Sequence, residues 1–101
     1  NIQPAVTREV RASGWDLAEL LVAWLAEIHG EGEARREIYG SFAVDELARA
    51  DGACRVVGRA TGEGVDPARH RLVCEIKAVT YHQAWVREED GLWRAQVIFD
   101  L

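Results

Sequence analysis

Hydrophobic and polar positions repeat with two different periods along the chain, and the change of period separates one helix from several strands. In residues 16–29 the spacing i, i+3, i+4, i+7 predicts an amphipathic helix with the apolar stripe Leu17, Leu20, Leu21, Trp24, Leu25 and Ile28. Asp16 is a suitable N-cap, Glu19 completes a capping box, and Gly30 is expected to end the helix.

Most of the other segments alternate with the period of two that strands show. Residues 5–13 predict a first strand, residues 35–47 a second with Gly40 as a candidate bulge, and residues 54–61 a short third strand. The side chains expected inside the core from the second strand are Ile38, Phe42, Val44 and Leu47.

The C-terminal third predicts a long hairpin. Residues 71–88 and 92–101 read as strands joined at Asp90-Gly91, a strong hairpin signal. One face is predicted to be core: Leu72, Cys74, Ile76, Ala78, Thr80, Ala84 and Val86 opposite Trp93, Ala95, Val97, Phe99 and Leu101. On the other face a two-residue turn places Asp100 opposite Tyr81, with Lys77 about 13 Å further along. His82 falls on the core face, which favours a satisfied core histidine over a general base.

These elements predict an α+β fold, an antiparallel sheet with one long helix packed on a face. The 101 residues form one domain, 1–101.

A net charge of −5 argues against strong direct binding to nucleic acid or anionic lipid, and suits a cation or a basic protein partner. With no apolar run of membrane-spanning length and no leader at the start, we expect a cytoplasmic protein, in which Cys54 and Cys74 are buried free thiols.

Two adjacent carboxylates end the chain, the side chain of Asp100 and the terminal carboxylate of Leu101. Clustered oxygens of this kind are ligands for Ca²⁺ or Mg²⁺, although a solvated terminus has the same composition. Lys77 is the single lysine in a chain with eleven arginines. Its side chain could contact a phosphate or a partner protein, or it could form an ordinary surface ion pair.

A polar cluster surrounds the glycine-rich stretch after the third strand. Glu63, Asp66 and His70 are candidates for a functional loop, while Gly62 and Gly64 also fit a simple turn. No nucleophile–base spacing and no phosphate-binding glycine pattern is present, so the residues alone supply no catalytic site.

Several longer strings resemble the archease family. The helix Asp16-Leu17 to Glu27 resembles the family's DLE-LLV-WL-E helix. Gly62-Glu63, Asp66, His70 and then residues 75–82, EIKAVTYH, resemble its GE…D…H…KAVTYH stretch, and the ending WRAQVIFDL resembles its terminus. The match runs in order from about Val6 to Leu101.

The resemblance implies an SHS2-like α+β fold and a non-catalytic activator of the RtcB-type RNA-splicing ligase. Such a protein promotes guanylylation of the ligase and multiple turnover in tRNA splicing and RNA repair. It also implies a divalent cation, commonly calcium, held by aspartates, to which Asp100 and Leu101 correspond here. The alternative is a chaperone-like adaptor for nucleic-acid-modifying enzymes that needs no metal.

The chain departs from the family pattern at its start, where the resemblance implies an aspartate-containing segment, a strand and a helix. We therefore expect an incomplete cation site and uncovered apolar surface on the sheet, which a homo-oligomer would hide. Glu63, Asp66, His70, Lys77 and His82 remain candidates for partner contacts.

Overall fold

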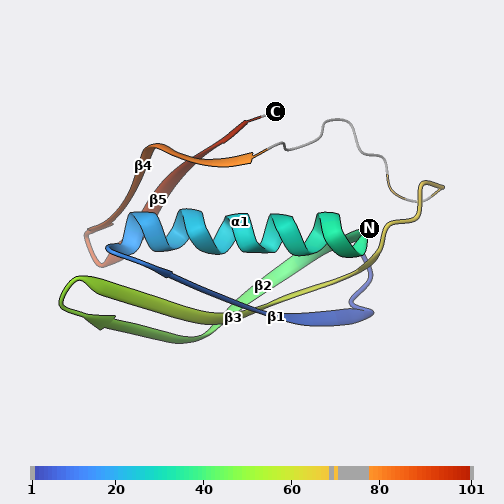
Figure 1. Ribbon diagram of the computed structural model, residues 1–101, viewed down its shortest axis with the longest axis horizontal. Coiled ribbons are helices and arrows are strands. Elements are labelled where there is room, and N and C mark those ends of the chain that lie inside the picture. Colours follow the sequence, from blue (N-terminus) through green and yellow to red (C-terminus); the bar gives the residue numbers. More distant parts are fainter. Residues whose placement is uncertain (1, 69, 71–77, 101) are drawn as a thin grey trace.

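The computed structural model describes residues 2–68, 70 and 78–100, and it places one helix between a sheet and a hairpin (Figure 1). The elements are β1 (Val6–Gly14), α1 (Leu17–Arg35), β2 (Glu37–Ala50), β3 (Ala53–Gly64), β4 (Ala78–Glu89) and β5 (Leu92–Asp100). β3 lies between β1 and β2 in a three-stranded antiparallel sheet, and β4 pairs with β5 separately. The α+β class with one helix packed on antiparallel strands is confirmed.

Helix α1 begins where the sequence predicts. Asp16 is extended (φ −139°, ψ 179°), and its carboxylate accepts a hydrogen bond from the Glu19 amide at 2.8 Å. The Glu19 carboxylate in turn accepts from the Trp15 amide at 3.0 Å. The two side chains therefore satisfy backbone donors that the first helical turn leaves free.

The end of α1 lies beyond the predicted stop at Gly30, which stays helical. The helix ends instead at Arg36, which takes the left-handed conformation (φ 53°, ψ 54°) and donates its amide to the Gly32 carbonyl. Side-chain contacts at i,i+4 spacing favour the added turn. They are the ion pair between Glu31 and Arg35 and a contact of 3.3 Å between His29 Nε2 and Glu33 Oε1.

The buried core lies between α1 and the β1–β3 half of the sheet. It consists of Leu20, Trp24 and Ile28 from the helix with Val10, Cys54, Val56 and Ala60 from the strands. The Trp24 indole donates to the Val10 carbonyl at 3.1 Å, and its ring sits over Gly58. Cys54 is a buried free thiol as predicted, whereas Cys74 lies outside the described residues.

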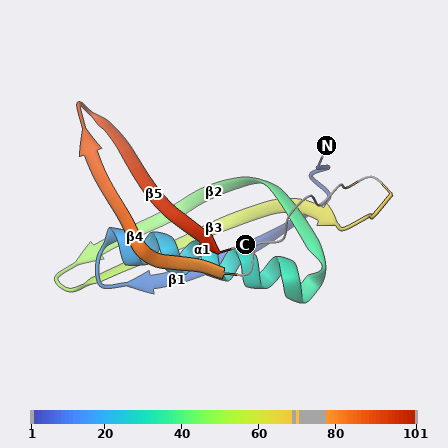
Figure 2. The ribbon, with the colours of Figure 1, turned by 90° about the horizontal axis from the view of Figure 1, so that it is seen from above.

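The inner face of β2 is largely uncovered, contrary to the prediction for Phe42, Val44 and Leu47. The register pairs them with Ala60, Gly58 and Val56, so they share the face that α1 covers elsewhere. They are nevertheless 53%, 54% and 55% exposed. A helix is about 10 Å wide and three strands span about 14 Å, so one helix leaves an outer strand bare. Figure 2 shows α1 over the β1 side of the sheet.

Bulges shape both long strand pairs. In β2 the register shifts at Gly40, as predicted, and again between Val44 and Glu46. In the hairpin, Asp90 and Gly91 have positive φ (52° and 79°), which fits the predicted two-residue turn.

A larger irregularity lies within the hairpin, where the register shifts between Thr80 and Trp85 and Gln83 has a φ of 56°. Asp100 consequently pairs with Ala78, and the predicted position opposite Tyr81 is wrong. The predicted alternation also fails in part, because Trp93 and Phe99 are 58% and 42% exposed. The predicted strand residues 71–77 lie outside the described residues.

Candidate functional site

Glu63, Asp66 and His70, the candidates for a functional loop, come together at the end of β3. Glu63 belongs to β3 itself rather than to a loop, and it pairs with Ile38 of β2. The side chains of His70 and Glu63 are only 3% and 9% exposed. His70 Nε2 lies 3.3 Å from Glu63 Oε2, so the fold builds a buried imidazole–carboxylate pair.

The hydrogen bonds of this cluster orient the imidazole. The Asp66 amide donates to His70 Nδ1 at 2.8 Å, so Nδ1 is a hydrogen-bond acceptor, whereas Nε2 makes no hydrogen bond within the described residues. The His70 amide donates back to the Asp66 carbonyl at 2.7 Å. Glu63 Oε2 also accepts from the Gln3 amide at 2.5 Å. The cluster therefore joins the N-terminal residues, β3 and the chain that follows it.

This arrangement is better suited to holding the chain than to acid–base chemistry. A general base must reach the proton of a bound substrate, and both side chains here are buried. The Asp66 carboxylate accepts from the Ala68 amide at 3.0 Å and so caps the turn at Pro67-Ala68.

A second polar network, which sequence reasoning missed, links β1 to β2 near the end of α1. The Arg8 guanidinium contacts Glu37 through two hydrogen bonds of 2.9 and 2.6 Å, and the Tyr39 hydroxyl donates to the same carboxylate at 2.8 Å. The Arg8 hydrogen bonds hold the pKa of Glu37 at about 2. Burial, with the Glu37 hydrogen bond, raises the pKa of Tyr39 to about 12. The available signal was a charged residue at an inward position of β1 and another at an inward position of β2, the two strands that flank β3.

Asp100 ends β5 and is exposed, beside the start of β4. Leu101 and Lys77 lie outside the described residues. Within the residues that the structure describes, no three His, Cys, Asp or Glu side chains gather closely enough to hold a metal ion. Because Ca²⁺ takes six to eight oxygens, Asp100 is at most one ligand of a larger set. This part of the chain does not by itself fit a complete cation site.

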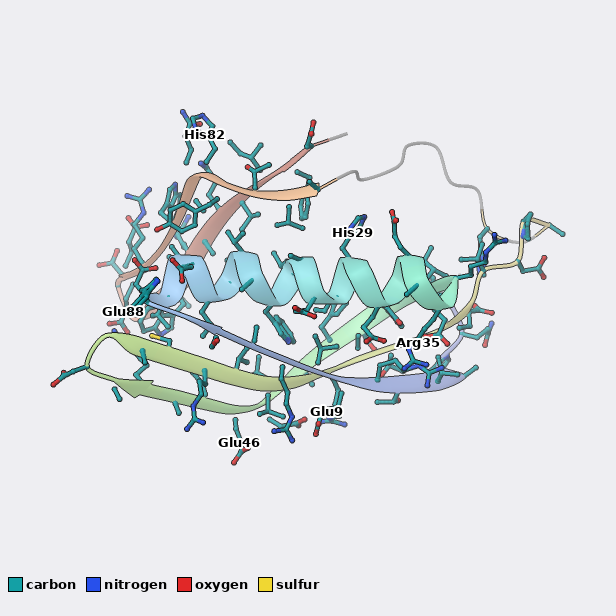
Figure 3. All side chains as sticks on the ribbon, viewed as in Figure 1. Glu9, His29, Arg35, Glu46, His82 and Glu88 are labelled. Atoms are coloured by element: carbon teal, nitrogen blue, oxygen red, sulfur yellow. The ribbon has the colours of Figure 1, made fainter. Side chains whose placement is uncertain are left out.

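His82 is exposed, and its prediction as a core histidine is wrong. It lies in the irregular stretch between Thr80 and Trp85, where the period of two is broken. Figure 3 shows its ring on the side of the hairpin that faces away from α1.

An apolar groove opens between the hairpin, α1 and β2. Its volume is about 330 Å³. The lining side chains include Leu17 and Leu21 of α1, Val44 and Leu47 of β2, and Val86 and Trp93 of the hairpin. This surface continues the uncovered face of β2, so the expectation of exposed apolar surface on the sheet is confirmed.

The arrangement of helix, sheet and hairpin defines a small α+β domain whose fold is shared with a solved structure. The solution structure of Methanobacterium thermoautotrophicum protein 1598 matches it with a TM-score of 0.80 and 32% identity, over 99% of this chain and 70% of that one. The sequence profile of the archease protein family matches residues 1–101. The chain belongs to the archease family.

Individual relatives agree with this assignment. The archease protein of Methanopyrus kandleri is 44% identical over 100 residues, which are 99% of this chain and 71% of that protein. The archease protein of Methanosarcina mazei is 37% identical over 94 residues, 93% of this chain and 64% of that protein. The chain thus spans about two thirds of the length of these relatives. No helix in the described residues has the length and apolar character needed to cross a bilayer.

Proposed function

We propose that the chain is a non-catalytic activator of an RtcB-type RNA-splicing ligase in the cytoplasm. It promotes guanylylation of the ligase and so supports multiple turnover in tRNA splicing and RNA repair. The observation that carries this proposal is membership of the archease family over residues 1–101. The net charge of −5 supports docking to a partner whose RNA-binding cleft is basic.

We further propose that Asp100 and the terminal carboxylate of Leu101 bind a divalent cation, calcium in the first place. Asp100 is exposed at a strand end, where a carboxylate can reach a cation or a basic partner. The remaining ligands must come from outside the described residues. Calcium titration of the isolated chain by calorimetry tests this, since Asp100→Ala should remove the binding heat.

The decisive experiment measures label transfer from GTP to a cognate ligase, with and without the chain at catalytic ratios. Faster transfer with the wild-type chain is the expected result. Asp100→Ala should lose the stimulation, whereas Glu88→Ala removes another exposed carboxylate of the same hairpin and should keep it. Full-length Methanopyrus kandleri archease is the positive control, because this chain spans 71% of its length.

The outcomes show whether residues 1–101 activate the ligase and whether that activation needs Asp100. If the full-length relative stimulates and this chain does not, residues 1–101 are insufficient for activation. If neither protein stimulates a cognate ligase, the proposed function is wrong. If Asp100→Ala stimulates as well as wild type, Asp100 has no part in it.

A chaperone-like adaptor without a metal requirement is the second candidate, and the apolar groove supports it. Contiguous exposed apolar surface marks sites that bind other proteins. Val44, Leu47 and Trp93 provide such a surface. Stimulation that survives Asp100→Ala but is lost in Leu47→Lys would favour the adaptor.

A further inference from the structure

β2 is an outer strand with a free edge and an uncovered inner face. Within the described residues it pairs with β3 alone, and Figure 2 shows it on the side of the sheet away from β1. On its inner face Phe42, Val44 and Leu47 are exposed, because α1 lies over the β1 side. A long edge strand with exposed apolar side chains is a template for pairing with another chain.

Two bulges give the inner face of β2 a symmetric pattern. Gly40 and Asp45 are the extra residues at its two register shifts against β3. The inward-facing residues of β2 are those paired with the β3 positions that carry the buried core: Glu37, Tyr39, Phe42, Val44, Leu47 and Arg49. Successive members of this series are alternately two and three residues apart, so the series reads the same from either end.

This symmetry fits β2 to an antiparallel copy of itself. With a two-fold axis at Ala43, inward residues meet inward residues along the whole strand: Phe42 with Val44, Tyr39 with Leu47, and Glu37 with Arg49. A bulge on an edge strand normally obstructs such pairing. Here Gly40 and Asp45 lie in stretches of equal length that face each other, so the two strands stay in step. We propose that a second copy of this chain docks at this edge, β2 against β2 about Ala43, and joins the two three-stranded sheets into one.

The charges along β2 support a second copy as the occupant. In this register no like charges lie opposite each other, and Glu37 of one copy meets Arg49 of the other at both ends. Arg49 lines the apolar groove and has no ion pair within the described residues, whereas Glu37 keeps its own contact with Arg8. A closed two-fold interface requires this kind of self-complementarity.

The bulges also select one register. A shift of the axis from Ala43 to Val44 would set the inward Phe42 of one copy opposite Glu46 of the other, which faces the outer side of the sheet. Apolar and charged side chains would then meet on the wrong faces. The pairing about Ala43 avoids this conflict, and it does not depend on the proposed activation of a ligase.

Sedimentation equilibrium of the whole chain tests whether a second copy binds at β2. The wild type should have twice the mass of one chain. Val44→Lys should raise the dissociation constant of the dimer about tenfold or more, because inward charges on an edge strand oppose pairing. Val44 is exposed, so this variant should keep the wild-type circular dichroism spectrum. Thr7→Lys changes an exposed residue of β1, the other outer strand, and should leave the mass unchanged. A monomeric wild type, or a dimer that Val44→Lys does not weaken, would overturn the proposal.

A cysteine on the two-fold axis tests the register. In Ala43→Cys the introduced residues would lie directly opposite each other, at the Cα separation of about 4.5–5.5 Å that a disulfide can span. Mild oxidation should therefore give a covalent dimer that a reductant separates, and the wild type controls for its two native cysteines. Ala48→Cys is the matched control on the same outer face, because its two thiols would be about 33 Å apart along the strands. Equal linkage in both variants, or none in Ala43→Cys, would show that β2 does not pair with itself about Ala43.

Discussion

The contact between Trp24 and Gly58 predicts that one added methyl group in β3 strongly destabilises the fold. A Cβ at Gly58 would lie 2.6 Å from Trp24 Cζ2 and 2.6 Å from the Ala43 carbonyl oxygen of β2. Both contacts are too short to persist, so the indole must leave its position and the β2–β3 ladder must open. Overpacking of this kind costs about 1–3 kcal/mol. Because a ring and a backbone must both yield, we expect Gly58→Ala to cost about 2–3 kcal/mol of unfolding free energy.

Gly64→Ala is the matched control, because it makes the same change in the same strand. A Cβ at Gly64 would meet nothing within 4 Å. Alanine there should be neutral or stabilise by up to about 1 kcal/mol. Urea unfolding followed by far-ultraviolet circular dichroism gives both values, and a loss of 2 kcal/mol moves the midpoint by about 1 M.

The same assay can refute the reasoning. Equal midpoints for Gly58→Ala and Gly64→Ala would mean that Trp24 does not sit over Gly58. In a Trp24→Leu background the cost of Gly58→Ala should shrink, since the ring contact is gone. It should not vanish, because the Ala43 carbonyl remains in place. Full additivity of the two changes would contradict the described packing.

Three further predictions follow from other contacts. The pKa of Glu37 is about 2 in the fold against an ordinary 4.5, so the ionised Glu37 carboxylate contributes its full stabilisation above about pH 4.5 and loses it as the pH falls toward 2. Glu37→Gln should therefore flatten the pH dependence of the urea midpoint in this range. An unchanged slope would contradict the pairing of Glu37 with Arg8. Asp16→Ala should cost about 1 kcal/mol through the lost N-cap and Asp16→Asn much less, measured by thermal unfolding; equal losses would exclude the cap. The wild-type chain should self-associate in sedimentation experiments and bind an apolar dye, and Leu47→Lys should reduce both; a dye-silent wild type would mean that the groove is not accessible.

Local sequence signals predicted the parts of the fold that depend on few neighbours. The Asp16–Glu19 cap, the Asp90-Gly91 turn and the Gly40 bulge each arise from residues within one turn of chain, and each is present. The helix end is different, because side-chain contacts one turn apart, among them the ion pair between Glu31 and Arg35, favour continuation of α1 past Gly30 to Arg35, with Arg36 as the C-cap. A single glycine such as Gly30 ends a helix less strongly than several i,i+4 side-chain contacts extend it.

Alternation along a strand predicted side-chain faces correctly only while the register stayed regular. The irregular stretch in β4 changed the partner of Asp100 and placed His82 in solvent. No local signal marks it, since Gln83 is not a residue that positive φ favours. The sequence placed Glu63, Asp66 and His70 around one glycine-rich stretch, whereas their contacts, their burial and the direction of each hydrogen bond required the three-dimensional structure.

The distribution of buried side chains separates the two candidate sites energetically. Every buried hydrophobic residue in the described part of the chain belongs to β1, α1 or β3, and none to the hairpin. Elements with few buried contacts open locally at lower free energy than the core does. Glu63 therefore lies on β3, which carries buried core residues, whereas Asp100 lies on a strand pair that has none among the described residues. One wall of the apolar groove is the hairpin itself, through Val86 and Trp93, so a molecule that fills the groove contacts the hairpin near its turn. Asp100 lies at the other end of β5, beyond the register shift between Thr80 and Trp85.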